Sequence, residues 1–355
     1  MRKLYVFFLL TTFLISSCQN KGLVETYKPV RYNLEFNGLP RPSIPKDNQL
    51  TEEGVELGRR LFYETALSKD NSISCASCHR QENAFSDPRK FSEGVRKLKG
   101  KRQAMAIFNM LWNTNEFFWD GRAHLLRDQS LLPIQDTLEM DETLERVVAK
   151  LQTLKDYKER FKRAFPNKEI SEVTISLALE QFMNSIVSNR SKFDKNNEGK
   201  AFFTASEERG KEIFFGGFRS GKGANCAQCH GEANFENDDY MNNGLDLDRD
   251  LKDLGRDAVK RGFLTKGAFK VPSLRNIAVT APYMHDGRFK TLDEVIEHYN
   301  SGVKSDRNTN VTLSIIAKSG GLQLSNQDKI DLKAFLLTLT DEDLLKDSRY
   351  SNPFE

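Results

Sequence analysis

The chain has 355 residues, with 53 Lys+Arg against 50 Asp+Glu, 38% hydrophobic and 10% aromatic residues. This length predicts about two domains. A charged content of 29% argues against a disordered chain and against a bundle of membrane helices. The formal net charge of +3 excludes the basic footprint that nucleic-acid binding needs.

The N-terminus has the pattern of a targeting segment. Two basic residues precede an apolar run, residues 4–15, that is too short to span a membrane permanently. The run ends in Ile15-Ser16-Ser17-Cys18, which resembles the lipobox of bacterial lipoproteins, where the cysteine is lipidated. We therefore expect a lipoprotein signal peptide over 1–18, with an ordinary signal peptide as the alternative, and an extended proline-containing tether over 19–48. The folded part is then expected in the periplasm or at the cell surface, held to a bacterial membrane by lipid alone.

Four of the five cysteines fall in two C-x-x-C-H motifs, Cys75-Ala76-Ser77-Cys78-His79 and Cys226-Ala227-Gln228-Cys229-His230. This spacing is the attachment signature of c-type haem, in which two thiols bond to the vinyl groups and the adjacent imidazole reaches the iron. Two such motifs in one exported chain use every cysteine except Cys18, which disfavours zinc half-sites and disulfides. The sequence predicts two covalently bound c-type haems with His79 and His230 as proximal ligands.

The sequence around each motif repeats. Residues 56–62 precede the first motif as residues 208–214 precede the second, and the two motifs begin 151 residues apart. Asp120-Gly121-Arg122 lies downstream of the first motif and Asp286-Gly287-Arg288 downstream of the second. This order predicts a tandem pair of related domains.

The elements between these motifs have helical patterns. Val173 and Met183 belong to an apolar stripe that follows a helix start at Ser171, and an amphipathic pattern covers Ser325 to Leu339. Two capping boxes, Thr204 with Glu207 and Thr291 with Glu294, mark further starts, and the sequence has no strong alternating strand run. We expect an all-α fold of two tandem cytochrome c-like haem domains with long loops, an N-terminal domain (49–200) and a C-terminal domain (201–342), followed by a tail (343–355).

The side chains on the far side of each haem decide its chemistry. A c-type haem with two strong protein ligands transfers electrons, whereas one with an open sixth position binds peroxide or oxygen. The sequence has no histidine between His79 and the first D-G-R motif, so the first haem is expected to be five-coordinate. The alternative is that Met105, Met110 or the more distant His124 occupies the sixth coordination position of this haem.

The second haem has four candidate ligands, Met284, His285, His298 and Tyr299. A helix from Thr291 would place Tyr299 on its buried stripe and turn His298 about 100° away from it. Tyrosine ligation lowers a haem reduction potential relative to methionine. The residues alone leave Tyr299 open between a ligand and a buried core side chain.

Taken together, the motifs resemble the bacterial dihaem cytochrome c peroxidase family, including the MauG-like branch that oxidises a partner protein. The similarity covers roughly residues 49–342. It is carried by both C-x-x-C-H motifs and by residues 118–122, 133–135, 139–140, 271–276 and 281–287. The resemblance implies reduction of hydrogen peroxide with electrons from a small reduced cytochrome or another donor, and it leaves a homodimer open.

The resemblance also implies roles for individual residues. Glu139 matches the distal glutamate that helps cleave the peroxide O–O bond, and Gln129 and Pro133 match other residues of that pocket. A carboxyl there takes a proton from peroxide and returns it to the departing oxygen; without the resemblance, a surface glutamate would be the expectation for this acidic stretch. Trp119 matches the tryptophan thought to relay electrons between the haems, with core packing as the alternative.

Two departures from the family pattern favour the MauG-like branch. Many members place a histidine that blocks the peroxidatic iron seven residues before an arginine that matches Arg102, and Val95 stands there instead. An apolar side chain cannot ligate iron. The position that usually supplies methionine to the other haem aligns with Tyr299, which makes Tyr299 the preferred ligand and Met284 the second.

A calcium ion often lies between the haems in this family. Carbonyl groups that match Thr280 and Pro282 contribute to its binding. The usual asparagine ligand is Gln103 here, so calcium is a weaker expectation than the haems. Three functions therefore stand in order: a dihaem peroxidase, a MauG-like oxidase of a protein substrate, and a dihaem electron carrier without catalysis.

Overall fold

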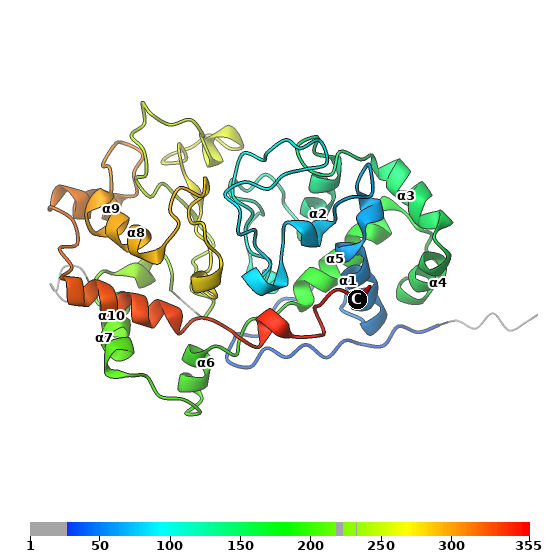
Figure 1. Ribbon diagram of the computed structural model, residues 1–355, viewed down its shortest axis with the longest axis horizontal. Coiled ribbons are helices and arrows are strands. Elements are labelled where there is room, and N and C mark those ends of the chain that lie inside the picture. Colours follow the sequence, from blue (N-terminus) through cyan, green and yellow to red (C-terminus); the bar gives the residue numbers. More distant parts are fainter. Residues whose placement is uncertain (1–26, 218–222, 232) are drawn as a thin grey trace, which may run out of the picture.

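The computed structural model describes residues 27–217, 223–231 and 233–355 (Figure 1). The predicted signal peptide, Cys18 and the first part of the predicted tether lie outside these residues. The described chain is largely helical, with long loops and one pair of two-residue strands, β1 (Tyr240–Met241) and β2 (Phe269–Lys270), which pair antiparallel. The helices are α1 (Glu52–Tyr63), α2 (Leu126–Gln135), α3 (Leu144–Thr153), α4 (Lys155–Ala164), α5 (Glu172–Ser185), α6 (Lys192–Asn197), α7 (Ala205–Phe215), α8 (Leu292–Glu297), α9 (Val311–Lys318) and α10 (Asn326–Leu337).

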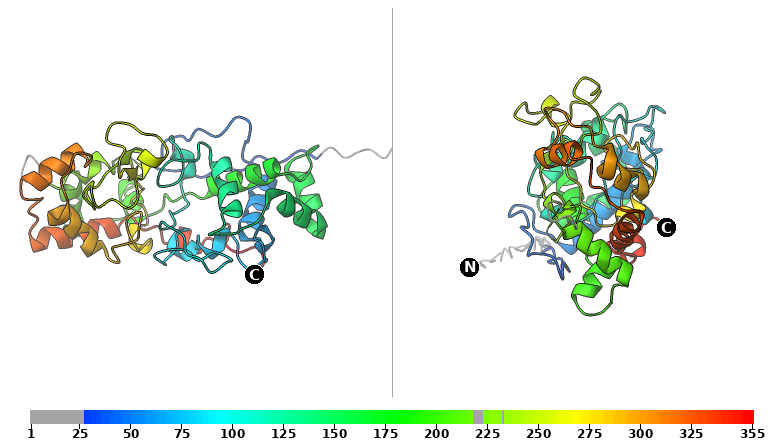
Figure 2. Two further views of the ribbon diagram at one scale, coloured as in Figure 1. Left: turned by 90° about the horizontal axis from the view of Figure 1, so that it is seen from above. Right: turned by 90° about the vertical axis from the view of Figure 1, so that its left-hand side faces the viewer.

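The helices form two units that lie side by side (Figures 1 and 2). The first is built on α1 to α5 around a core that includes Leu61, Phe85 and Phe182. The second is built on α7 to α10 around a separate core that includes Phe214 and Phe335. Each unit thus has its own hydrophobic core.

Each unit is centred on a pair of closely packed helices that meet at a glycine. A Cβ on Gly58 of α1 would lie 1.9 Å from the Ala178 carbonyl oxygen of α5. A Cβ on Gly210 of α7 would lie 1.9 Å from the Asp331 carbonyl oxygen of α10. Only glycine permits this approach, and the same crossing occurs in both units. The sequence repeat is therefore a repeat of structure.

Local capping explains where the helices begin. Ser171 caps α5, Thr204 caps α7 with Glu207, and Ser325 caps α10, as the sequence predicts. Helix α5 differs from the expected amphipathic pattern, because every residue from Thr174 to Ser185 is buried, whereas Val173 is 56% exposed.

Two segments, one before α1 and one after α10, pack on the first unit. The segment predicted as a free tether packs from its described part onward, because the Tyr32 amide donates to the Leu50 carbonyl and the buried Asn48 amide donates to Glu180 at 2.7 Å. The predicted tail is likewise folded. It returns from α10 to α1 (Figure 1), where Tyr350 is only 3% exposed.

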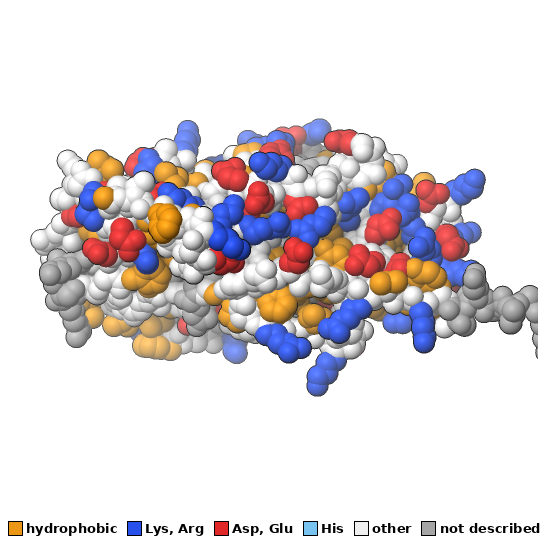
Figure 3. All heavy atoms as spheres, turned by 90° about the horizontal axis from the view of Figure 1, so that it is seen from below, with side chains coloured by type: hydrophobic (Ala, Val, Ile, Leu, Met, Phe, Trp, Pro, Cys, Tyr) orange, Lys and Arg blue, Asp and Glu red, His pale blue; other side chains and the backbone are white. Residues whose placement is uncertain are grey.

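The surface is mixed in charge. On the face shown in Figure 3, Lys and Arg side chains alternate with Asp and Glu. No helix within the described ranges is long and apolar enough to cross a membrane.

Candidate functional site

The first C-x-x-C-H motif forms a tight turn that aims its side chains at one cavity. Cys75 begins the short 3-10 helix η2 (Cys75–Ser77), and neither Cys75 nor Cys78 is in a disulfide. The His79 Nδ1 atom lies 2.9 Å from the Phe85 carbonyl oxygen. Burial lowers the pKa of His79, while the carbonyls of Phe85 and Met105 oppose that shift.

The second motif has the same construction. Cys226 begins η6 (Cys226–Gln228), and the His230 Nδ1 atom lies 3.1 Å from the Pro272 carbonyl oxygen. Burial lowers the pKa of His230 to about 4, against the opposing carbonyls of Phe235 and Pro272. Each imidazole thus has a backbone carbonyl beside its Nδ1 atom, which leaves its Nε2 atom to bind a metal.

These residues fit a thioether-linked haem. Burial raises the pKa of Cys75 and of Cys226 to about 12, so both are neutral thiols at the wall of a cavity. The second cavity is walled mainly by apolar side chains such as Phe214, Ile296 and Leu336. A porphyrin needs this combination of two thiols, one imidazole and an apolar surround.

The first cavity brings together the three predicted distal residues with His79. Gln129 and Pro133 lie one turn apart on α2, and Glu139 follows the end of that helix. Pro133 has no N–H, so α2 cannot make its usual hydrogen bond to the Gln129 carbonyl. Burial, helped by the nearby Asp136 carboxylate, raises the pKa of Glu139 to about 7, while Arg122 acts in the opposite direction. A carboxyl with this pKa exchanges protons near neutral pH.

The loop that carries Val95 packs directly on the backbone of Glu139. The Val95 amide donates to the Glu139 carbonyl at 2.9 Å. A Cβ on Gly94 would lie 2.4 Å from the same oxygen. Gly94 contributes to the cavity wall, whereas Val95 does not. The loop therefore packs on the backbone of Glu139, and Val95 itself does not reach the cavity.

The alternative ligands of the first site differ in position. His124 is exposed and lies outside the cavity walls. Met105 and Met110 line the walls of both cavities. Met183 of α5, which sequence reasoning missed, lines the first cavity next to His79 and Glu139. Its position on the predicted apolar stripe of α5 was the signal that could have indicated it.

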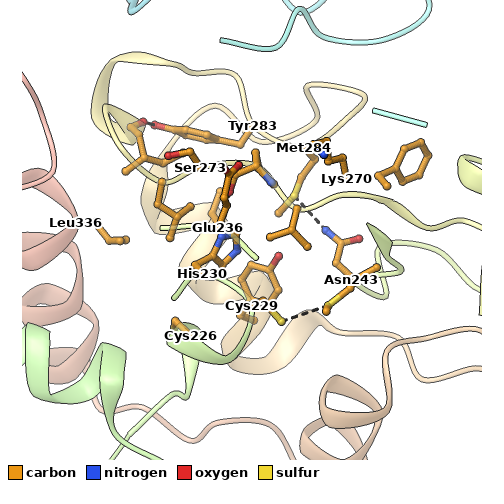
Figure 4. Close-up of a pocket in the computed structure, with 18 of the residues that line it drawn as sticks. Cys226, Cys229, His230, Glu236, Asn243, Lys270, Ser273, Tyr283, Met284 and Leu336 are labelled. Atoms are coloured by element: carbon orange, nitrogen blue, oxygen red, sulfur yellow. Dashed lines mark hydrogen bonds between the residues drawn. The ribbon is translucent and has the colours of Figure 1, made fainter. Parts of the chain in front are cut away.

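The second cavity contains both proposed ligands, Tyr299 and Met284, together with His230. In Figure 4 the Asn243 amide points at the sulfur of Met284, with a donor distance of 3.3 Å. Burial raises the pKa of the Tyr299 hydroxyl to about 12, and a hydrogen bond with the Asn243 side chain acts in the opposite direction. Asn243 thus links the two candidate ligands.

Tyr299 lies in a π-helical turn, not in the α-helix that the sequence pattern suggests. Helix α8 ends at Glu297, and a π-turn covers His298–Gly302. His298 is buried, contrary to the expectation that it turns away, because its Nε2 atom bonds the Asn243 carbonyl at 3.0 Å. It does not line the second cavity. Single π-turns inside helices frequently occur at functional sites.

Several side chains separate the two cavities. Trp119 lines both, and its indole N–H donates to the Gln103 carbonyl at 2.8 Å. The Lys270 amide of the second unit donates to the Trp119 carbonyl at 2.8 Å. His285 also lines both cavities and stacks on Phe269, with ring centroids 3.6 Å apart. Trp119 and His285 therefore lie at the boundary between the two cavities.

The residues expected at a calcium ion lie near this boundary. Gln103, Thr280 and Pro282 all line the second cavity. The Gln103 amide donates to the Asp87 carbonyl at 3.1 Å. The described residues contain no group of three or more His, Cys, Asp and Glu side chains suited to a metal ion.

Known proteins share this arrangement. Residues 52–201 match the family described as di-haem cytochrome c peroxidase. The chain is 35% identical over 298 residues to the methylamine utilization protein MauG of Methylophilus methylotrophus, covering 83% of this chain and 84% of that protein. It is 35% identical over 246 residues to cytochrome c551 peroxidase of Nitrosomonas europaea, covering 68% and 71%. A solved MauG-like protein associated with microbial copper homeostasis matches with a TM-score of 0.82 and 34% identity, covering 91% of this chain and 100% of that one. The chain belongs to the di-haem cytochrome c peroxidase family.

Proposed function

We propose that hydrogen peroxide is reduced to water in the first cavity, and that electrons from an external donor arrive through the second. As a member of this family the protein is an oxidoreductase with two c-type haems. We assign one haem to Cys75, Cys78 and His79 and the other to Cys226, Cys229 and His230. The observation that carries the assignment of the reaction site is the buried Glu139 carboxyl, with a pKa raised to about 7, in the same cavity as His79.

The haem of the first cavity, when bound, supplies an iron that binds peroxide and takes up its oxidising equivalents. Glu139 acts as general base and then general acid. Its carboxylate removes a proton from peroxide, and the resulting carboxyl returns this proton to the departing oxygen. Gln129 orients the peroxide by hydrogen bonding, and Pro133 shapes the wall beside it. The apolar Val95 leaves the distal side to Glu139 and Gln129.

The second site takes up electrons and passes them to the first. Tyr299 is our preferred axial ligand there, and Met284 is the second choice. Asn243 supports either assignment, because it is hydrogen bonded to both side chains. Trp119 relays electrons toward the first site, since it lines both cavities.

The test is peroxide turnover by the purified holoprotein with a small reduced cytochrome as donor. Replacing Glu139→Gln keeps the side chain's shape and removes its proton transfer. We expect a loss of about 10²- to 10⁴-fold in turnover, the usual contribution of a positioned acid–base group. Glu145→Gln is the matched control, since Glu145 is exposed in the first turn of α3, lines neither cavity and should leave turnover near the original value. Unchanged turnover in Glu139→Gln would contradict the proposal.

A second candidate function is a MauG-like oxidase, in which peroxide drives oxidation of a partner protein's side chains. Val95 and the placement of Tyr299 in the second cavity favour it. The discriminating measurement is rapid-mixing spectroscopy with peroxide alone. Fast turnover with the small cytochrome and no long-lived oxidised state favours the peroxidase, and a persistent oxidised state that only a protein substrate discharges favours the oxidase.

We also propose lipid attachment at Cys18, which would hold the folded units at the periplasmic or outer surface of a bacterial membrane. The support is the lipobox-like sequence. Replacement Cys18→Ala should release the protein from the membrane fraction. A calcium ion near Gln103, Thr280 and Pro282 is a further proposal, and metal analysis of Gln103→Ala against the unaltered holoprotein tests it.

A further inference from the structure

The C-terminal segment connects the two units at a defined point. After α10 the chain reaches Asp341, a fully buried carboxylate that accepts the amides of Asn189 and Arg190, each at 3.0 Å. From there it crosses onto the first unit, where the Tyr350 hydroxyl donates to the Ser185 carbonyl at 2.9 Å. Residues 341–350 are therefore a strap from the second unit that ends in the core of the first.

The strap packs against the turn that follows the first C-x-x-C-H motif, residues 81–85. The Gln81 side chain donates to the Leu344 carbonyl at 3.0 Å and to the Asp347 carbonyl at 2.9 Å. The Tyr350 ring meets the Phe85 ring edge-on, with centroids 6.4 Å apart. Phe85 is the residue whose carbonyl lies 2.9 Å from His79 Nδ1. The strap therefore contacts both ends of residues 81–85, the segment that places the Phe85 carbonyl beside His79.

This turn needs external support because its backbone is strained. Ala84 has φ 49° and Phe85 has φ 58°, two successive residues with side chains in the left-handed region. Such residues are disfavoured there and persist only when the surrounding structure holds them. Phe85 is fully buried, and its ring contacts both Tyr350 of the strap and Phe62 of α1. Its carbonyl also accepts the Ile107 amide at 3.2 Å, so the strap is one of several contacts that hold it.

The corresponding turn after His230 is packed by other residues. Phe235 has φ 55° and holds the corresponding place after His230. Its ring is packed by Phe193, Phe335 and Arg275, which all lie outside the strap. The strap therefore packs on the turn after His79 and not on the turn after His230. Near the second motif it reaches Asn276, whose side-chain oxygen accepts the Asp341 amide at 2.8 Å.

We propose that the strap is a positioning element for His79, acting through Gln81 and Tyr350 on the carbonyl of Phe85. The proposal rests on the assignment of His79 as the iron ligand of the first haem. A carbonyl that accepts the imidazole N–H makes the histidine a stronger electron donor to iron. Loosening the strap should weaken that donation at the first haem alone.

Two variants test this in the full-length holoprotein. Tyr350→Leu removes the ring that meets Phe85, and Gln81→Ala removes the two bonds to the strap. In each we expect a lower iron–histidine stretching frequency in the resonance Raman spectrum of the reduced first haem and a higher midpoint potential of that haem. The second haem should keep its midpoint potential.

Phe354→Leu is the matched control, because this tail aromatic contacts Arg60 and not the turn. It should leave both haems unchanged. Tyr350→Phe keeps the ring and should also keep the frequency of the first haem. If Tyr350→Leu fails to fold, Gln81→Ala decides the outcome.

The proposal is overturned if the folded variants retain the frequency and potential of the first haem, or if both haems shift equally. Haem content is measured in parallel. An unaltered holoprotein that carries both haems but shows no iron–histidine stretch at the first haem would contradict the assignment of His79 itself, which separates failure of the proposed function from failure of the strap proposal.

Discussion

The two C-x-x-C-H motifs are built alike, but they lie in cavities with different side chains. In both motifs the histidine Nδ1 atom lies beside a backbone carbonyl, and both units cross two helices at a glycine. The first cavity joins His79 with Gln129 and Glu139, from α2 and the segment after it. The second cavity joins His230 with Met284 and Tyr299. The repeated part of the sequence thus builds the two C-x-x-C-H sites, and the segments that do not repeat give the two cavities different side chains. We propose that this difference divides the reaction between them.

The largest effects should come from removing one proximal histidine at a time. In His79→Gly we expect loss of reaction with peroxide, and in His230→Gly loss of electron uptake from the donor, because each iron loses its protein ligand. Both variants should therefore fail in steady-state turnover. Rapid mixing separates them, since only His230→Gly should still react with a single equivalent of peroxide. Added imidazole should restore part of each reaction, and identical behaviour of the two variants would remove the functional distinction between the units.

The next effect concerns the stability of the second unit. Arg275 is 1% exposed and forms a two-bond ion pair with Asp194, at 2.8 Å for each bond. Asp194→Asn leaves this guanidinium buried without a counter-charge, so the free energy of unfolding should fall by about 3–5 kcal/mol. Asp343→Asn is the control, because its pair with Lys195 is exposed and should contribute less than about 1 kcal/mol. Denaturant titration of the holoproteins measures both, and equal small effects would contradict the prediction.

Matched glycine substitutions compare the two helix crossings. Gly58→Ala and Gly210→Ala should each lower the free energy of unfolding by about 1–3 kcal/mol, because the added methyl group meets a backbone carbonyl. Gly100→Ala should be close to neutral, since the nearest atom to its Cβ would lie at 3.8 Å. If only one of the two variants lowered the free energy of unfolding, the two helix crossings would not be equivalent in packing.

A smaller effect is the pH dependence of peroxide reduction. Glu139 must be ionised to accept a proton, and its pKa is raised to about 7. The rate of reaction with peroxide should therefore increase as the pH rises through about 7 and then level off. Asp136→Asn removes a repelling charge and should move the midpoint down, whereas Arg122→Gln should move it up. Midpoints that do not move in opposite directions would contradict this electrostatic account.

The parts of the molecule that could be predicted from sequence depend on local chemistry. The two C-x-x-C-H motifs, the helix starts at Ser171 and Thr204, and the glycine-containing repeat need only neighbouring residues. Residues whose burial depends on contacts distant in the sequence were not predicted. Glu180 is buried within α5 because Arg127 neutralises it at 3.0 Å, and Tyr350 is buried because the first unit receives it.

The positions of side chains in the second site also depend on contacts that are distant in the sequence. A regular helical period places Tyr299 on the buried side and His298 away from it. The π-turn at His298–Gly302 buries His298 as well, held by the carbonyl of Asn243, which is distant in sequence. Similarly, the cavity position of Glu139 came from family resemblance, since its acidic neighbours alone indicate a surface residue. Here tertiary contacts, not local preference, decide the position of each side chain.

The most direct test of the division of labour is electron paramagnetic resonance of the resting ferric holoprotein, with Tyr299→Phe beside it. We predict one high-spin signal from the haem on His79 and one low-spin signal from the haem on His230. Only the low-spin signal should change in Tyr299→Phe. Two low-spin signals that both persist after peroxide is added would contradict the account and leave a protein that only carries electrons.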